Sequence, residues 1–429
     1  MKASPLARAI TLASLGGCLA LPSLAHADFV KDSKASLELR NFYMNRDYRQ
    51  DSPLPKVTGK TPTEYKSHSE EWAQGFLLRA ESGYTEGTIG VGVDALGLVG
   101  VRLDSGRGQS GTGLLQLDKE TGEAQSSYGA IGATGKFKVS KSVLKVGTLQ
   151  PKNPVLQAND TRLLPQTFEG GSLNVLEIDK LSLNAGMFEQ VKQRASSDRE
   201  DMTLNGSSAR GSDNFQFAGA DYALSKNLTG SYYYAQLENI YQQNFAGLVY
   251  LQPLGEGQTL KADLRYFDSS DNGNQYAGKI DNRALNGMLT YGVGAHAFGL
   301  GYQRMNGDNA FPYITDSDPY LVNYVQIGNF ASSEEQSWQA RYDLNFASYG
   351  IPGLTLMTRY VTGDNIDRGA QAEGKEWERD TDLAYVLQDG ALKGLGVKWR
   401  NATYRSNLAK TTEDLDENRL ILSYTVALW

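Results

Sequence analysis

Apolar residues alternate with polar or small residues in segments of about ten residues along most of this chain. Residues 260–266 read LKADLRY and residues 338–346 read WQARYDLNF, with an apolar residue at every second position. A two-residue period places the two sets on opposite faces of a β-strand. The same alternation recurs at residues 35–40, 76–81, 181–187, 395–400 and 419–428, with Leu77 as an irregularity. The pattern predicts an all-β, antiparallel protein.

Two kinds of connection separate the predicted strands. Short connections such as residues 254–257 (LGEG) are typical of tight hairpins. Long polar connections lie at residues 47–71, 196–214 and 306–336, and the first and third contain prolines, which are excluded from central strands. Residues 28–429 allow roughly 16–18 strands at about 22–25 residues for a strand and its connection.

Alternation alone is also expected of a soluble β-sandwich, whose outer face is polar. Here the apolar sets often end in Tyr, Trp or Phe, as the aromatic girdle of a membrane barrel does, and the chain ends on Trp429 after an alternating strand. The composition includes 46 Gly and 24 Tyr among 429 residues, a balance typical of β-barrels. We therefore predict a transmembrane β-barrel and keep the soluble all-β protein as the alternative.

The first residues resemble an export signal. Lys2 and Arg8 are followed by an apolar stretch from residue 9 to about residue 24 and by the small-residue site Ala25-His26-Ala27. We expect cleavage after Ala27, which gives residues 1–27 as signal peptide and residues 28–429 as one barrel domain in the outer membrane of a Gram-negative cell. The stretch ending in Cys18 also fits a lipoprotein signal, which is the alternative.

Composition disfavours several classes of function. Without Lys2 and Arg8 the chain has 40 basic and 49 acidic residues, so a nucleic-acid partner is not expected. Cys18 is the only cysteine, and neither metal-ligand spacing nor a phosphate loop is present, so no metal and no cofactor are expected. An outer-membrane lipase or protease is the enzymatic alternative, but His68 and His296 lack the sequence context of a catalytic triad.

Basic residues recur on the polar side of the alternating segments. Because a charge facing lipid costs about 2–4 kcal/mol at mid-membrane, these side chains are predicted to face the lumen. The predicted lumen residues are Arg40, Arg79, Lys136, Lys138, Lys145, Lys261, Arg265, Arg341, Arg359, Lys398, Arg400 and Arg419. Either they pair with acids on the same rows, such as Glu38, Asp263 and Asp343, or they form successive weak sites for a carboxylate.

Residues 150–171, QPKNPVLQANDTRLLPQTFEGG, fit neither a strand nor a solvated loop. Pro151, Pro154 and Pro165 prevent the segment from spanning the membrane as a strand, and its leucines, valine and phenylalanine make it too apolar for a loop tip. A loop folded into the barrel satisfies both constraints, since irregular backbone is tolerated against protein and water. Asp160 and Arg162 would then lie at the constriction.

The chain resembles the OprD/Occ family of substrate-specific outer-membrane carboxylate channels over essentially all of residues 28–429. The motifs that carry the resemblance are SLELRNFYMNRDY from Ser36, NDTRLLPQTFEGG from Asn159 and SWQARYDLNFASYGIPGLTLMTRYVTGD from Ser337. The resemblance implies an 18-stranded barrel, an inward-folded third extracellular loop, a basic ladder in the lumen and an eyelet bounded by the third and seventh loops.

The resemblance also implies roles for individual residues. Arg162 and Arg194 are implied at the eyelet, and Arg359 and Arg419 in the ladder. The stretch DNAFPYITDSDPYLVNYVQ resembles the seventh loop, where Asp308, Asp316 and Asp318 either hold the cationic end of a zwitterion or are solvated.

The expected partners are small carboxylate solutes and outer-membrane lipid, for a monomer or a loose homotrimer. Within the family, one branch takes aromatic or cyclic acids such as benzoate-like compounds, and we favour this branch. The alternatives are a channel for basic amino acids and peptides and a general diffusion porin without preference.

Overall fold

The computed structural model describes residues 26–53, 65–106, 108–408 and 414–429. Most of the expected signal peptide, including Cys18, lies outside these residues, and the short helix α2 (His26–Lys31) covers the expected cleavage site. No helix in the described part of the chain is long and apolar enough to cross a membrane.

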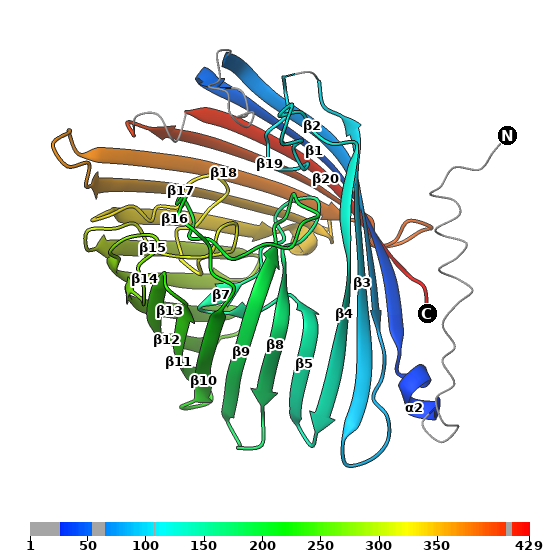
Figure 1. The fold of residues 1–429 in the computed structure, drawn as a ribbon. Helices are drawn as coiled ribbons and strands as arrows, with labels where there is room; N and C mark the ends of the chain where they lie inside the picture. The colour runs from blue at the N-terminus through cyan, green and yellow to red at the C-terminus, as the bar shows by residue number, and fades with distance from the viewer. Residues whose placement is uncertain (1–25, 54–64, 107, 409–413) are drawn as a thin grey trace.

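Eighteen strands in the described residues form one closed antiparallel barrel. Each strand pairs with the next along the chain, and β1 pairs with β20, so that the blue and red ends of the sheet lie side by side in Figure 1. The predicted 18-stranded barrel is confirmed. The strands are β1 (Lys34–Pro53), β2 (Tyr65–Glu81), β3 (Gly90–Asp104), β4 (Ser127–Val139), β5 (Ser142–Leu149), β8 (Thr167–Val175), β9 (Leu181–Lys192), β10 (Phe215–Ala223), β11 (Leu228–Leu237), β12 (Tyr241–Gly255), β13 (Gln258–Asp271), β14 (Asp281–Val293), β15 (His296–Asn306), β16 (Gln336–Asn345), β17 (Leu354–Ile366), β18 (Gly374–Val386), β19 (Gly396–Ser406) and β20 (Leu415–Ala427).

Three further elements lie between barrel strands. The two-residue strands β6 (Lys152–Asn153) and β7 (Leu156–Gln157) pair with each other between β5 and β8. The 3-10 helix η1 (Phe346–Tyr349) follows β16 and ends on Gly350, which has a left-handed φ of 83°. A left-handed residue after a helical turn is usually glycine because it lacks a Cβ atom.

The connections alternate between short and long. The turn between β12 and β13 is tight, and Gly257 there has a φ of 68°, which glycine adopts without strain. The predicted connections at 196–214 and 306–336 match the observed ones, residues 193–214 and 307–335, within a few residues.

Two predicted boundaries were wrong. Strands β1 and β2 extend into the predicted connection at 47–71, as far as Pro53 and from Tyr65, since proline is tolerated at the end of a strand. The last five residues of the predicted loop at 150–171 belong to β8, which follows Pro165.

The two rows of side chains on each strand differ in exposure. Large apolar side chains on the apolar row are exposed, among them Leu264, Leu300 and Trp338, as expected for a surface that meets lipid. Aromatic pairs of this row join neighbouring strands, with ring centroids 4.4 Å apart for Tyr302 and Trp338. The row that carries the arginines and lysines, here called the polar row, lies on the opposite face.

Leu77, the irregular position of the β2 alternation, lies on the polar row and is fully buried. It belongs to an apolar cluster that includes Phe42 of β1 and Leu163 and Leu164 of the segment 150–166. A Cβ atom on Gly75 of β2 would lie only 3.1 Å from the carbonyl oxygen of Leu163. The segment 150–166 therefore contacts the polar rows of β1 and β2 through apolar side chains, and this contact explains the irregularity.

Replacing Leu77 with Ala should lower the free energy of unfolding by about 2–4 kcal/mol. The substitution leaves a cavity next to Leu163 and Leu164 that the surrounding side chains fill only in part. The neighbouring Leu78→Ala is the matched control, since Leu78 is exposed on the apolar row. Urea unfolding in lipid vesicles measures both. Equal losses for the two variants would contradict the packing described for Leu77.

Candidate functional site

The predicted lumen arginines of the strands share the polar row of the barrel. Arg341 of β16 lies directly opposite Arg359 of β17, and Arg400 of β19 lies opposite Arg419 of β20. Like charges in such positions destabilise a sheet unless acids lie between them. The structure supplies these acids from the same row.

Eight of the nine predicted arginines have a carboxylate within ion-pair distance. The separations of nitrogen and oxygen lie between 2.6 and 3.0 Å. The pairs are Arg40 with Glu38 and Asp160, Arg79 with Glu38, Arg194 with Asp316, Arg265 with Asp263, Arg341 with Asp343, Arg359 with Asp380, Arg400 with Asp382, and Arg419 with Glu417. Most of the positive charge on the wall is thus balanced by a fixed acid.

Arg162 is the exception among the nine. Within the described residues no carboxylate lies within ion-pair distance of its guanidinium, and its Nη1 donates only to Thr161. Its Nε is buried without a hydrogen-bond partner. Removal from water and then the positive charges of Arg419 and Arg194 lower the pKa of Arg162 well below its usual value. Such an environment favours the arrival of an anion.

Arg194 joins the two long segments that surround Arg162. Its Nη2 donates to Asp316 of the segment 307–335 at 2.6 Å, and its Nη1 donates to the hydroxyl of Thr161 at 2.8 Å. Gln166 donates to the carbonyl oxygen of Thr315 at 3.0 Å, which adds a second link. Arg162 and Arg194 are therefore brought together where the segments 150–166 and 307–335 meet.

The positive charge of Arg419 acts on Arg162, but Arg419 itself is buried beneath the segment 307–335. Only 1% of the residue is exposed, and its Nη2 donates to the carbonyl oxygen of Gln326 at 3.2 Å. Its partner Glu417 also accepts from Gln326 and from Arg46, each over a short distance. Arg419 thus anchors the segment 307–335 to β20, and direct contact with a solute would require that segment to move.

Arg46 was missed in the sequence, although a signal for it exists. It lies six residues after Arg40 on β1, so it has the same parity and shares the polar row. The residues of the segment 307–335 that contact the arginines, Gln326 and Asp316, carry no such signal because the segment has no period.

The two acids predicted at the site differ in their surroundings. Asp160 accepts two hydrogen bonds from Arg40. Asp308 is exposed, and no described contact joins it to the arginines. Burial raises the pKa of the Asp318 carboxyl, which also accepts a hydrogen bond from the backbone of Tyr320. The acid that the structure brings to the arginines from this segment is therefore Asp316.

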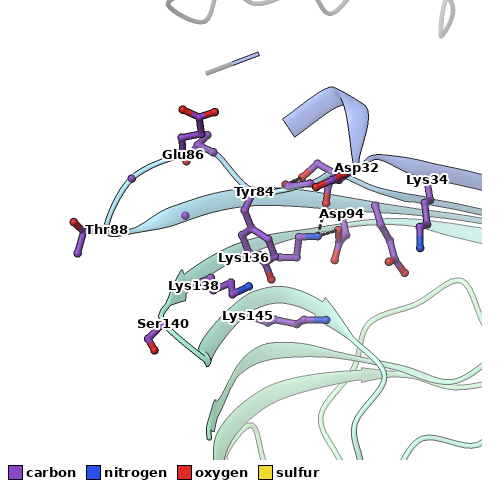
Figure 2. A pocket seen from close by; sticks show the side chains of 16 residues that line it. Asp32, Lys34, Tyr84, Glu86, Thr88, Asp94, Lys136, Lys138, Ser140 and Lys145 are labelled. Carbon is purple, nitrogen blue, oxygen red and sulfur yellow. Dashed lines mark hydrogen bonds and ion pairs between the residues drawn. The ribbon is translucent and has the colours of Figure 1, made fainter. Parts of the chain in front are cut away.

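A second basic cluster lies at the barrel end that carries the short turns. There a cavity of about 670 Å³ is lined by the turn after β2, by β4 and β5, and by Lys34 (Figure 2). Lys136 pairs with Asp94 at 2.6 Å, and the ammonium groups of Lys136 and Lys138 lie 5.0 and 5.5 Å from the ring centre of Tyr84. The predicted lumen residues Lys136, Lys138 and Lys145 meet here. In the described residues no group of acids and histidines has the arrangement of a metal site.

Comparison with known proteins was made over the whole chain. Residues 27–428 match the model of the outer membrane porin, OprD family. The chain is 41% identical to the porin-like protein GalP of Pseudomonas putida over the full length of both. It is similar to the crystal structures of OpdQ of Pseudomonas aeruginosa, with 55% identity and a TM-score of 0.82, and of a BenF-like porin of Pseudomonas fluorescens, with 40% identity and a TM-score of 0.86. These cover 94% and 93% of this chain and all of the other chains.

Replacing Arg40 with Met should free the segment that carries Arg162. Arg40 donates to Asp160 and to the carbonyl oxygens of Arg162 and Leu163. Charge-assisted hydrogen bonds contribute about 1.5–3 kcal/mol each, so the occupancy of a wider conductance state should rise at least about tenfold. Single-channel recording in planar bilayers measures this occupancy.

The control for this prediction is Arg79→Met, since Arg79 has Glu38 as its ion-pair partner and no described contact with the segment 150–166. Conductance that is unchanged in the Arg40 variant would show that other contacts hold the segment.

Proposed function

We propose that this chain, which belongs to the OprD family of outer-membrane porins, is a passive channel for small solutes that carry a carboxylate. Its relatives are porins and its place is the outer membrane. The proposal adds that Arg162 and Arg194 are the residues that meet the carboxylate, that the segment 150–166 narrows the lumen there, and that no chemical reaction is catalysed. Among carboxylates, we propose that aromatic or cyclic acids are favoured.

The uncompensated charge of Arg162 is the observation that carries the proposal. At the other predicted arginines an entering carboxylate has to compete with a fixed acid, whereas at Arg162 it meets a guanidinium without one. Arg162 also lies beside Arg194 and Arg419, whose charges add to the attraction. A guanidinium with free donors binds a carboxylate through two parallel hydrogen bonds.

Release from this site is favoured by the paired arginines beyond it. Arg79 and Arg341 are the more accessible wall arginines, with about a third of each side chain exposed. A carboxylate binds there only by sharing the arginine with its acid, so the binding is weak. Conduction through a selective channel needs sites that are favourable enough to enter and weak enough to leave.

The contacts of the segment 307–335 favour an acid over a basic amino acid. A channel for basic amino acids needs a free acid beside the arginines for the cationic end of the solute, and the acid of this segment that contacts them, Asp316, is already paired with Arg194. Rings of the same segment lie near the arginines instead. Tyr324 accepts a hydrogen bond from Asn159, three residues before Arg162, and Tyr313 of the same segment is buried. A ring next to a guanidinium suits an aromatic acid.

Uptake into liposomes that contain the purified barrel tests the proposal. A size-matched panel of benzoate, nicotinate, benzyl alcohol, arginine and a neutral sugar separates charge from size. Benzoate and nicotinate should enter faster than benzyl alcohol. Faster entry of arginine would identify a basic-amino-acid channel, and equal rates for all solutes would identify a general diffusion porin.

Replacing Arg162 with Ala should reduce benzoate uptake about tenfold or more, the equivalent of one charge-assisted hydrogen bond, and leave benzyl alcohol unchanged. Arg162→Lys should restore part of the uptake, since it keeps the charge without the two parallel donors. Arg379→Ala is the matched control, because Arg379 is exposed on the apolar row of β18. Unchanged benzoate uptake in a correctly assembled Arg162→Ala barrel would remove this residue from the mechanism.

A further inference from the structure

A pocket of about 240 Å³ lies between the wall formed by β10 to β13 and the segment 150–166, which contributes Lys152 and Gln157. Tyr233, Phe245, Arg265, Asp221 and Asp263 line it from the strands, and Tyr320 lines it from the segment 307–335. We propose that this pocket is a subsite for the uncharged ring of a hydroxylated aromatic acid. The inference rests on the proposed function, since the carboxylate of the solute is assigned to the arginines.

Glycines allow the aromatic rings of this wall to lie flat. Tyr233 of β11 stands opposite Gly219 of β10, and a Cβ atom on Gly219 would collide with the Tyr233 ring. A Cβ atom on Gly247 of β12 would lie 2.6 Å from the ring of Phe245. A ring over a cross-strand glycine covers the backbone and leaves open the volume that its side chain would otherwise fill. Tyr233 and Phe245 are thus packed against the wall, almost fully buried, where both line the pocket.

Tyr320 completes the aromatic surface from the opposite side. Its ring lies edge-on to that of Phe245, with centroids 5.9 Å apart and planes at 71°. Rings prefer such tilted arrangements, and a further ring gains from the same contacts. A cavity of about 150 Å³ is enough for benzene, so the pocket has room for one substituted ring.

The position of Tyr320 is over-determined. Its φ of 55° lies in the left-handed region, which is strained for a tyrosine. Arg265 holds both ends of the residue: its Nη1 donates to the Tyr320 carbonyl at 2.9 Å, and its guanidinium lies 3.8 Å from the ring centre. The Tyr320 amide donates to Asp318 at 2.8 Å. Three contacts thus keep Tyr320 in a strained backbone conformation, which indicates that the position of its ring has a functional role.

The charges of the pocket decide what kind of ring it takes. Asp221 and Asp263 are balanced by Lys152 and Arg265 among the lining residues, and Arg265 holds Asp263 through two hydrogen bonds. The pocket is therefore neutral and offers no excess of acid to a cation. A neutral ring therefore suits this pocket better than a charged group does.

Asp221 adds a preference for a hydroxyl group on that ring. Its oxygens accept from Ser231 at 2.6 Å and from Tyr233 at 2.5 Å, and a more distant Asn184 amide lies at 3.4 Å. A carboxylate has about four acceptor positions, so one remains for a hydroxyl group of a solute. A hydroxylated ring is therefore held more strongly than a bare one.

The pocket is close to the arginines along the chain. Tyr320 lies four residues after Asp316, the partner of Arg194, and four residues span at most about 14 Å. Tyr320 therefore lies no more than about 14 Å from Asp316.

Blocking of single channels in planar bilayers tests the subsite. The probes are 4-hydroxybenzoate, benzoate, acetate, 4-hydroxybenzyl alcohol and arginine, and the readout is the lifetime of each blocking event. Tyr320→Leu should shorten the lifetimes of 4-hydroxybenzoate and benzoate about three- to tenfold, the loss of one ring contact, and leave acetate unchanged. Tyr320→Phe should retain the long lifetimes. Tyr222→Leu, on the exposed apolar row of β10, is the matched control.

Asp221→Asn should bring the lifetime of 4-hydroxybenzoate down to that of benzoate. Equal lifetimes for the two acids in the unmodified channel, or a Tyr320→Leu variant that shortens acetate as much as benzoate, would overturn the subsite. So would a larger effect of Asp221→Asn on arginine than on 4-hydroxybenzoate, because the pocket would then take a cation. If the channel shows no preference for carboxylates but Tyr320→Leu still shortens the lifetime of 4-hydroxybenzyl alcohol, the subsite stands and the proposed function fails.

Discussion

Lipid on the outside of the barrel decides where each charge of the wall lies. A charged side chain on the apolar row costs about 2–4 kcal/mol at mid-membrane, so the predicted lumen arginines of the strands and the acids that pair with them share the polar row. There they lie within reach of each other across neighbouring strands, as Arg359 of β17 and Asp380 of β18 do. The wall is therefore rich in basic residues and yet locally close to neutral.

Arginines that are paired with an acid also stabilise the positions of neighbouring segments. Arg40 and Arg419 each hold an acid and also donate to backbone carbonyls of the long segments that meet at Arg162. Removal of one partner from a buried pair costs about 3–5 kcal/mol, because the other charge is left uncompensated. These paired arginines thus fix the positions of the segments 150–166 and 307–335, and they differ from Arg162 because each already holds an acid.

The barrel was predictable because the alternation imposed by lipid and the exclusion of proline from central strands both act over a few neighbouring residues. Alternation located seven of the eighteen strands, and the limits of the connections at 193–214 and 307–335 were predicted to within a few residues. Ion pairs between residues two apart, such as Arg265 with Asp263, were predictable from their shared row. Pairs across strands were not, since partners such as Arg46 and Glu417 are separated by 371 residues. The contacts of Tyr320 and Gln326 were hidden for another reason: their segment has no regular period, so its side chains cannot be assigned to a face.

The spacing of charges explains why Arg162, alone among the nine predicted arginines, has no acid partner in the described residues. Residues two apart on a strand are neighbours on one row, and four wall arginines accordingly pair with an acid two positions away, as Arg265 does with Asp263 and Arg341 with Asp343. Arg162 also has an acid two positions away, Asp160, but its segment is not a strand. The backbone there turns Asp160 toward Arg40 and leaves Arg162 without it. The site that we propose for an incoming carboxylate therefore lies where the two-residue period is broken.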